Sequence, residues 1–273
     1  MKKLLLALCI GSSFCAAAQN NTAPSVLKEG KVVYERTLQM QINFRGMNED
    51  LARQLPRSRT DNFELLFTAN KCLWQQLPNA SEEANTFSGG GGNVVMIRGG
   101  GGADDVSFTD LETGKRVDQR ELNSKNYLVD DSITKLAWKL TEDTKTILGY
   151  TARKAVAKQY TTRATVAMEN GELKRQVIPD TVNVVAWFTT SIPVAAGPLF
   201  QGQLPGLILE LDMNNGRNVY KAVEVSQKVN QGSIKEPKGG KRITAAEYAQ
   251  EREKALEEMR RNMPANGNFR IRS

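Results

Sequence analysis

Asparagine–glycine turns divide the second half of the chain into paired strands, and this feature constrains the fold more than any other. The turns are Asn170-Gly171 and Asn214-Asn215-Gly216. Asparagine and glycine both tolerate the positive φ that tight hairpins require. The strands predicted to flank them lie at 165–169, 172–178, 207–213 and 218–225. Hairpins between consecutive strands favour an antiparallel sheet over a βαβ arrangement.

Period-two alternation and short apolar runs predict the remaining strands. They lie at 38–44, 63–68, 73–77, 136–140 and 182–190. A short helix is expected from Asn48 to before Pro56. A longer one is expected at 244–263, because Thr244 and Glu247 have capping-box spacing. The fold class expected is mainly β (α+β): a large, curved antiparallel sheet with a helical C-terminal tail.

The first residues have the layout of a cleavable signal peptide. Lys2 and Lys3 are followed by an apolar run at 4–10 and by the small residues 16–18. We therefore expect residues 1–18 to be removed and the protein to be exported to the periplasm, the outer-membrane face or the medium. No later apolar run reaches the roughly 20 residues that span a bilayer, so no transmembrane segment is expected in the mature chain.

Lipid attachment at Cys9 or Cys15 is an alternative, although the residue before each is large. The expected organisation is one β-domain at 19–230, with a glycine-rich insertion at 88–103, and a basic tail at 231–273.

Positive charge is concentrated in the tail. Residues 228–273 contain 11 basic and 6 acidic residues, whereas residues 19–227 contain 24 of each. Such a tail fits either an acidic partner or head group, or a solvated helix of mixed charge. Nucleic acid is not an expected partner of an exported protein.

The chain contains no histidine, which excludes Ser-His-Asp and Cys-His triads and histidine-ligated metal sites. We expect no catalytic residues, no metal and no cofactor. Cys72 is the one cysteine after residue 18, and it is either a buried small hydrophobe or a reactive thiol. Glu210 and Asp212 share a strand face, either as a hydrolytic carboxylate pair or as the solvent side of a strand.

Two glycine runs, at 89–92 and 99–102, bracket an apolar stretch at 93–98. They lack the strand–helix setting of a phosphate-binding loop and fit flexible loop tips. The stretch between them is either a contact element for a partner or a plain hairpin insertion.

One stretch looks like a named motif. It comprises Trp187-Phe188-Thr189-Thr190-Ser191-Ile192-Pro193, Gly197-Pro198 and Leu204-Pro205-Gly206-Leu207-Ile208. The chain thereby resembles the GLPGLI family of exported bacterial proteins, for which we know of no established function. The resemblance covers most of the mature chain, from 30–35 through the tail, and includes a middle block at 138–155. It implies an envelope protein, and loosely a companion of transport systems.

Two positions depart from the family pattern. Gln203 stands where the family has the glycine before the leucine, and Ala152 stands where relatives often have a cysteine. The second change removes any cross-linking role of that thiol.

Two interpretations of the motif are open: a structural corner feeding a core strand, or the mouth of an apolar groove. The corner follows from Pro205-Gly206, which favours a tight turn with the glycine at positive φ. The groove would be lined by Trp187, Phe200, Leu204 and Leu207. The candidate ligand- or partner-binding residues are Trp187, Gly197, Pro198, Phe200, Leu204, Pro205, Gly206, Leu207 and Ile208.

We expect a non-catalytic binding or accessory protein for a hydrophobic small molecule, a lipid or an outer-membrane transport partner. A purely structural interaction module is the first alternative, and a carboxylate-dependent hydrolase is the second.

Overall fold

The computed structural model describes residues 27–39, 57–78, 105–169 and 172–262, with the side chains of 164–175, 259, 260 and 262 left aside. Within these ranges, twelve strands form a single sheet in the order β12-β6-β5-β4-β3-β2-β1-β11-β10-β9-β8-β7. Their bounds are β1 Gly30–Gln39, β2 Ser58–Phe67, β3 Lys71–Gln76, β4 Val106–Asp110, β5 Lys115–Leu122, β6 Lys125–Ser132, β7 Lys139–Ile147, β8 Tyr150–Glu169, β9 Glu172–Thr189, β10 Leu207–Met213, β11 Asn218–Ser226 and β12 Lys241–Thr244. The predicted fold class, a mainly antiparallel β-sheet, is confirmed.

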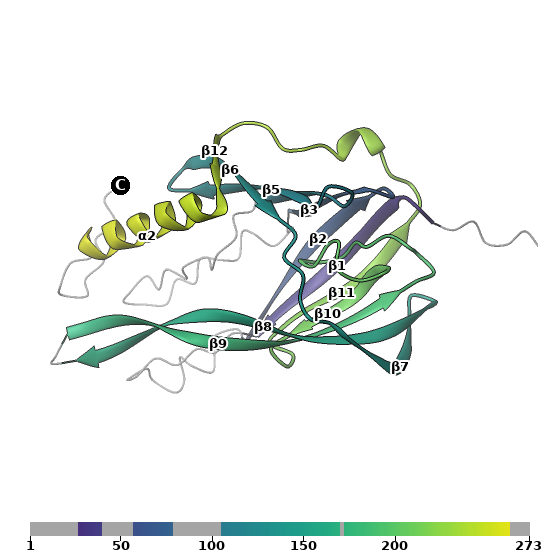
Figure 1. The fold of residues 1–273 in the computed structure, drawn as a ribbon, viewed down its shortest axis with the longest axis horizontal. Coiled ribbons are helices and arrows are strands. Elements are labelled where there is room, and N and C mark those ends of the chain that lie inside the picture. Colours follow the sequence, from purple (N-terminus) through teal and green to yellow (C-terminus); the bar gives the residue numbers. More distant parts are fainter. Residues whose placement is uncertain (1–26, 40–56, 79–104, 170–171, 263–273) are drawn as a thin grey trace, which may run out of the picture.

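The sheet bends until its two ends face each other across a concave side (Figure 1). Strands β1, β2, β10 and β11 form the middle of the bend, and the core fills the concave side. Alternation places Val32 and Tyr34 of β1 there, paired with Leu65 and Phe63 of β2. Trp74 completes an aromatic cluster, stacking on Phe63 with ring centroids 5.1 Å apart.

Strands β8 and β9 form one long hairpin whose far half leaves the sheet. Strand β7 pairs with β8 only as far as Val156, and β10 pairs with β9 only as far as Val184. Beyond these points, within the described residues, the two strands pair only with each other. This two-stranded ribbon, residues 158–169 and 172–183, is called the arm below, and it extends past the body beneath helix α2 (Figure 1).

Most sequence predictions of strands agree with this topology. The strands predicted at 63–68 and 73–77 correspond to β2 and β3, and both asparagine–glycine hairpins form between the expected strands. Two predictions were wrong in extent. Segments 172–178 and 182–190 are one strand that continues through Pro179, because a two-stranded ribbon has a free edge that tolerates proline. The strand placed at 136–140 begins at Lys139.

Several predictions fall outside the described residues. They are the signal peptide, residues 40–44 of the first strand, the helix at Asn48 and both glycine runs.

The C-terminal part of the chain adds to both faces of the sheet. After β11 it passes over the convex side, where a short 3-10 turn, η2 (Gln231–Ser233), precedes Ile234. Ile234 packs on Leu66, Leu73 and Phe108, which alternate with the core-facing residues. Strand β12 then pairs in parallel with β6, Ile243 opposite Val129.

Helix α2 (Ala245–Asn262) begins with the predicted capping box. The Glu247 amide donates to Thr244 Oγ1 at 3.2 Å, and the Thr244 amide donates to Glu247 Oε2 at 2.7 Å. Tyr248 anchors the helix, with its ring edge-on to Tyr127 at 5.7 Å. Leu256, further along the helix, is 42% exposed. In the described part of the chain, helices long and apolar enough to cross a membrane are absent.

Candidate functional site

The motif residues 190–206, between β9 and β10, fold back onto the concave side of the sheet. Their apolar side chains are buried in the core: Ile192, Val194, Ala196, Phe200 and Leu204. Backbone hydrogen bonds hold the segment against the start of β10. The Leu207 amide donates to the Ile192 carbonyl at 3.1 Å, and the Ile208 amide donates to the Ala196 carbonyl at 2.9 Å. The segment is therefore a fixed part of the core.

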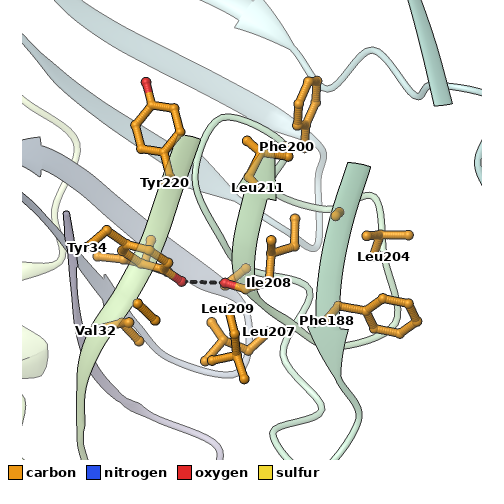
Figure 2. Packing of buried hydrophobic residues seen from close by; sticks show 14 of the residues in the cluster. Val32, Tyr34, Phe188, Phe200, Leu204, Leu207, Ile208, Leu209, Leu211 and Tyr220 are labelled. Atoms are coloured by element: carbon orange, nitrogen blue, oxygen red, sulfur yellow. Dashed lines mark hydrogen bonds between the residues drawn. The ribbon is translucent and has the colours of Figure 1, made fainter. Parts of the chain in front are cut away.

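A β-bulge lies where the motif enters β10. The register between β9 and β10 shifts between Ile208 and Glu210. There the Ile208 carbonyl accepts a 2.6 Å hydrogen bond from the Tyr34 hydroxyl, which reaches over β11 from β1 (Figure 2). Burial raises the pKa of Tyr34 well above its ordinary value, with a smaller effect from Cys72, so the hydroxyl remains a donor.

Two motif glycines are required by close approach. A Cβ on Gly206 would lie 2.1 Å from the Thr189 carbonyl oxygen, and a Cβ on Gly197 would lie 2.5 Å from the Ile208 Cβ. Neither position has room for any side chain. These glycines fix the return of the chain from β9 into β10. The corner interpretation was wrong about the conformation of Gly206, which does not have a positive φ and is required by close approach instead.

Gln203, the residue that departs from the family glycine, binds the connection between β6 and β7. Its Oε1 accepts hydrogen bonds from the Leu136 amide and from Trp138 Nε1, both at 3.0 Å. Its Nε2 donates to the Thr134 carbonyl at 3.1 Å. Trp138 also packs edge-on against Phe200, with centroids 5.6 Å apart. The substitution thus joins residues 134–138 to the motif.

The candidate binding residues do not form one apolar groove. Gly197, Pro198, Phe200, Leu204, Gly206, Leu207 and Ile208 are buried, whereas Pro205 is exposed. Leu204 and Leu207 are only 4% and 0% exposed, so they are core side chains. Ala186 and Phe188 project from one face of β9, and Trp187 projects from the other face. A binding role for the whole set stays a prediction.

Trp187 is half-buried against the core cluster and also contacts charged side chains. Lys145 Nζ lies 4.3 Å from the centre of its ring and 2.8 Å from Glu210 Oε1. Asp212 has a separate task, since its Oδ1 accepts a 2.6 Å hydrogen bond from the Gly216 amide in the hairpin turn. Each carboxylate of the suggested pair therefore has a structural partner.

A groove of about 660 Å³ opens on the concave side beside the motif. It is lined by residues 131–137, 158–160, 199–201 and Gln203, together with Thr109, Arg116 and Met213. Strands β4, β5 and β6 supply one wall, the start of the arm supplies another, and Phe200 connects the groove to the motif. Phe200 is the candidate binding residue that lines it.

The wall from β4 to β6 carries ion pairs on the concave face. Arg120 Nη1 lies 2.7 Å from Asp105, and its Nη2 lies 3.2 Å from Asp118. Burial lowers the pKa of Arg120, but Asp118 and Asp105 outweigh it, so the pKa is raised and the charge is fixed. Arg116, next along β5, pairs with Asp131.

Sequence reasoning missed this wall. A signal exists in the alternating charges Arg116, Asp118 and Arg120 around the buried Val117. Such a pattern is typical of a solvent-facing strand surface, and here it faces the concave side instead.

Cys72 lies fully buried in the core, and burial raises the pKa of its thiol. The interpretation as a buried small hydrophobe is confirmed. Among the described residues, no group of three or more cysteine and carboxylate side chains could hold a metal ion.

A family model matches residues 138–210. The family is described as a protein of unknown function (Porph_ging). The match begins at Trp138 and ends at Glu210, so it includes the contact between Trp138 and Gln203 and the whole corner. It agrees with the expected likeness to a bacterial family of unknown function, while the GLPGLI name stays a resemblance.

Other comparisons are weak. No curated protein matches the chain. Two solved structures of PNGF-II, in space groups C2 and P21, are similar at 18% identity and a TM-score of 0.49. They cover 83% and 84% of this chain, and this chain spans about a third of theirs (33% and 34%).

Proposed function

We propose that the chain is an exported, non-catalytic binding protein of the bacterial envelope that holds a hydrophobic small molecule or lipid in the concave groove. The observation that carries the proposal is the groove itself. Its volume of about 660 Å³ lies in the range of preformed small-molecule sites, roughly 300 to 1,000 Å³. Leu136, Leu199, Phe200 and Met213 give it apolar walls.

A binding role is favoured over hydrolysis by the positions of the carboxylates. Glu210 contacts Lys145, and Asp212 caps the turn at Gly216. Neither is among the residues that line the groove. The composition of residues 1–18 supports export, and a mature N-terminus at Gln19 would bear this out.

Native mass spectrometry of the mature protein, purified from its own envelope, tests the proposal. We expect a stoichiometric apolar molecule, released by solvent extraction. Leu199→Glu places a charge at the groove and should abolish retention. Leu148→Glu is a matched control, because both leucines have positive φ (60° and 51°) and are exposed (38% and 46%), but Leu148 lies outside the groove. Equal retention by both variants contradicts the groove as the binding site.

The arm favours a second candidate function, an interaction module. Tyr160 and Val177 are 81% and 58% exposed. Tyr160 pairs with Thr181, four residues from Val177 on β9, so both side chains project to the same face. An empty protein that retains an envelope partner, and loses it on Val177→Asp, would support this function over ligand binding.

A further inference from the structure

We propose that the ligand of the groove carries an anionic head, a carboxylate or a phosphate, and that Thr109 and Arg116 receive this head. The inference rests on the proposed binding role of the groove and adds the ligand's chemical class. It places the head at the wall formed by β4 and β5 and the apolar body against Phe200.

Thr109 is the first observation. The residue is 0% exposed, and within the described residues its Oγ1 has no hydrogen-bond partner. Buried hydroxyls in native proteins nearly always have one, so an unpaired hydroxyl beside a groove points to a group that comes from outside. A rotation about its Cα–Cβ bond is all that Thr109 needs to aim the hydroxyl at such a group.

Arg116 is the second observation. It lies directly opposite Thr109 in the register of β4 and β5, where facing Cβ atoms are about 4.5–5.5 Å apart. Its Nη2 binds Asp131, but its buried Nε has no hydrogen-bond partner among the described residues. Asp118 Oδ1 lies 3.5 Å from this Nε, close enough for charge attraction only. One donor direction of the guanidinium therefore remains for a ligand.

The charge of the groove favours an anion. Its charged lining residues are Arg116, Lys135, Lys158 and Asp131, so basic side chains outnumber acidic ones by three to one. Lys135 and Lys158 are exposed, and their charges add to the positive potential around the groove. A cationic head would meet three like charges, and a neutral head would leave the Arg116 Nε without a charged acceptor.

The rest of the lining determines the remainder of the ligand. Leu136, Leu199, Phe200 and Met213 offer apolar contacts beside the polar wall. The ligand class that satisfies both parts is an amphipathic anion, with one acidic head and one apolar tail.

Titration calorimetry of the delipidated mature protein tests this inference with three ligands of one tail: dodecanoate, dodecyl phosphate and dodecanol. We expect at least one of the two anions to bind about tenfold more tightly than the alcohol, because a charge-assisted hydrogen bond distinguishes them. Added salt should weaken the binding of the anion and leave the binding of the alcohol unchanged. Which anion binds more tightly distinguishes a carboxylate from a phosphate head.

Thr109→Val removes the hydroxyl at nearly constant volume. This variant should bind the anion several-fold more weakly and should bind the alcohol with unchanged affinity. Thr189→Val is the matched control, since Thr189 is also 0% exposed but lies outside the groove. Arg116→Lys keeps the positive charge but removes the guanidinium group. It should also weaken the binding of the anion, while the protein still unfolds cooperatively.

The outcomes separate this inference from the proposed function. Equal binding of alcohol and anions, unaffected by Thr109→Val, overturns the anionic head but retains the groove. No binding of any of the three ligands overturns both.

Discussion

Tyr34 and Ile208, 174 residues apart, are joined by a buried 2.6 Å hydrogen bond from the tyrosine hydroxyl to the isoleucine carbonyl. The two side chains are 0% and 1% exposed. The bond ties the first strand of the sheet to the bulge where the motif enters β10. Within the described residues, β10 pairs with β11 only from Glu210 onward, so the hydroxyl supplies the buried Ile208 carbonyl with a donor from another strand.

Tyr34→Phe should lower the free energy of unfolding by about 1–3 kcal/mol, because it leaves the Ile208 carbonyl buried without its donor. Urea unfolding followed by tryptophan fluorescence measures the loss. Tyr160→Phe removes the same hydroxyl from a residue that is 81% exposed, and should change stability by less than about 0.5 kcal/mol. Equal losses in the two variants would show that the buried bond contributes nothing.

Gln203→Met should lower the free energy of unfolding by roughly 1.5–4 kcal/mol. The change keeps most of the side-chain volume and removes three hydrogen bonds, to Thr134, Leu136 and Trp138, each worth about 0.5–1.5 kcal/mol net. Amide exchange at Leu136 should also accelerate, since its acceptor is lost. Gln203→Gly restores the residue of the resembled family, and it should be less stable than Gln203→Met because it also removes packing. Unchanged exchange at Leu136 in both variants would contradict the joining role of Gln203.

Local chemistry was sufficient to predict the hairpins. Asn214, Asn215 and Gly216 all adopt positive φ, at 60°, 56° and 84°, and their neighbours Met213 and Asn218 pair as the turn requires. The order of strands in the sheet was beyond such arguments. Strand β1 lies between β2 and β11 because Tyr34 faces Phe63 on one side and Ala222 on the other, and these pairings depend on distant packing.

The candidate site was predicted only in part, for a related reason. Pro205-Gly206 marked a corner, but Gly206 is required there by its approach to the Thr189 backbone and not by the positive φ that was expected. The groove takes its polar wall from Thr109 and Arg116, about a hundred residues earlier in the chain. Nothing near these residues in sequence indicates that the bend of the sheet will bring them opposite Phe200.

Gly206→Ala should destabilise the protein strongly, by about 3 kcal/mol or more. The new Cβ would lie 2.1 Å from the Thr189 carbonyl oxygen, and backbone atoms on both sides must move to admit it. Gly149→Ala separates this clash from the cost of backbone conformation. Gly149 has φ +81° with nothing within 4 Å, so its substitution should cost only about 1–2 kcal/mol. Thermal unfolding of the two variants measures the difference, and a smaller loss in Gly206→Ala would refute the close approach.

Asp61 should make the protein sensitive to acid. The residue is 0% exposed, with Arg59 Nε donating to its Oδ1 at 2.8 Å and Arg36 pairing with its Oδ2. Burial raises the pKa of Asp61, but hydrogen bonds from Arg36 and Arg59 outweigh burial and hold it below the ordinary 3.8. A depressed folded-state pKa contributes stability that is fully present above the unfolded value. This contribution is lost as pH falls from about 4 through the folded pKa.

Asp61→Asn should therefore lower the free energy of unfolding at neutral pH by about 3–5 kcal/mol, because two arginines lose a buried counter-ion. It should also flatten the fall in stability below pH 4, since the titrating group is gone. Asp143→Asn is the control: Asp143 pairs with Lys154 at 3.0 Å, but its side chain is 58% exposed, so the variant should follow the wild-type curve. Urea unfolding at a series of acid pH values measures both effects. If the free energy of unfolding of Asp61→Asn still falls with pH below 4 as in the wild type, the acid sensitivity belongs to other carboxylates.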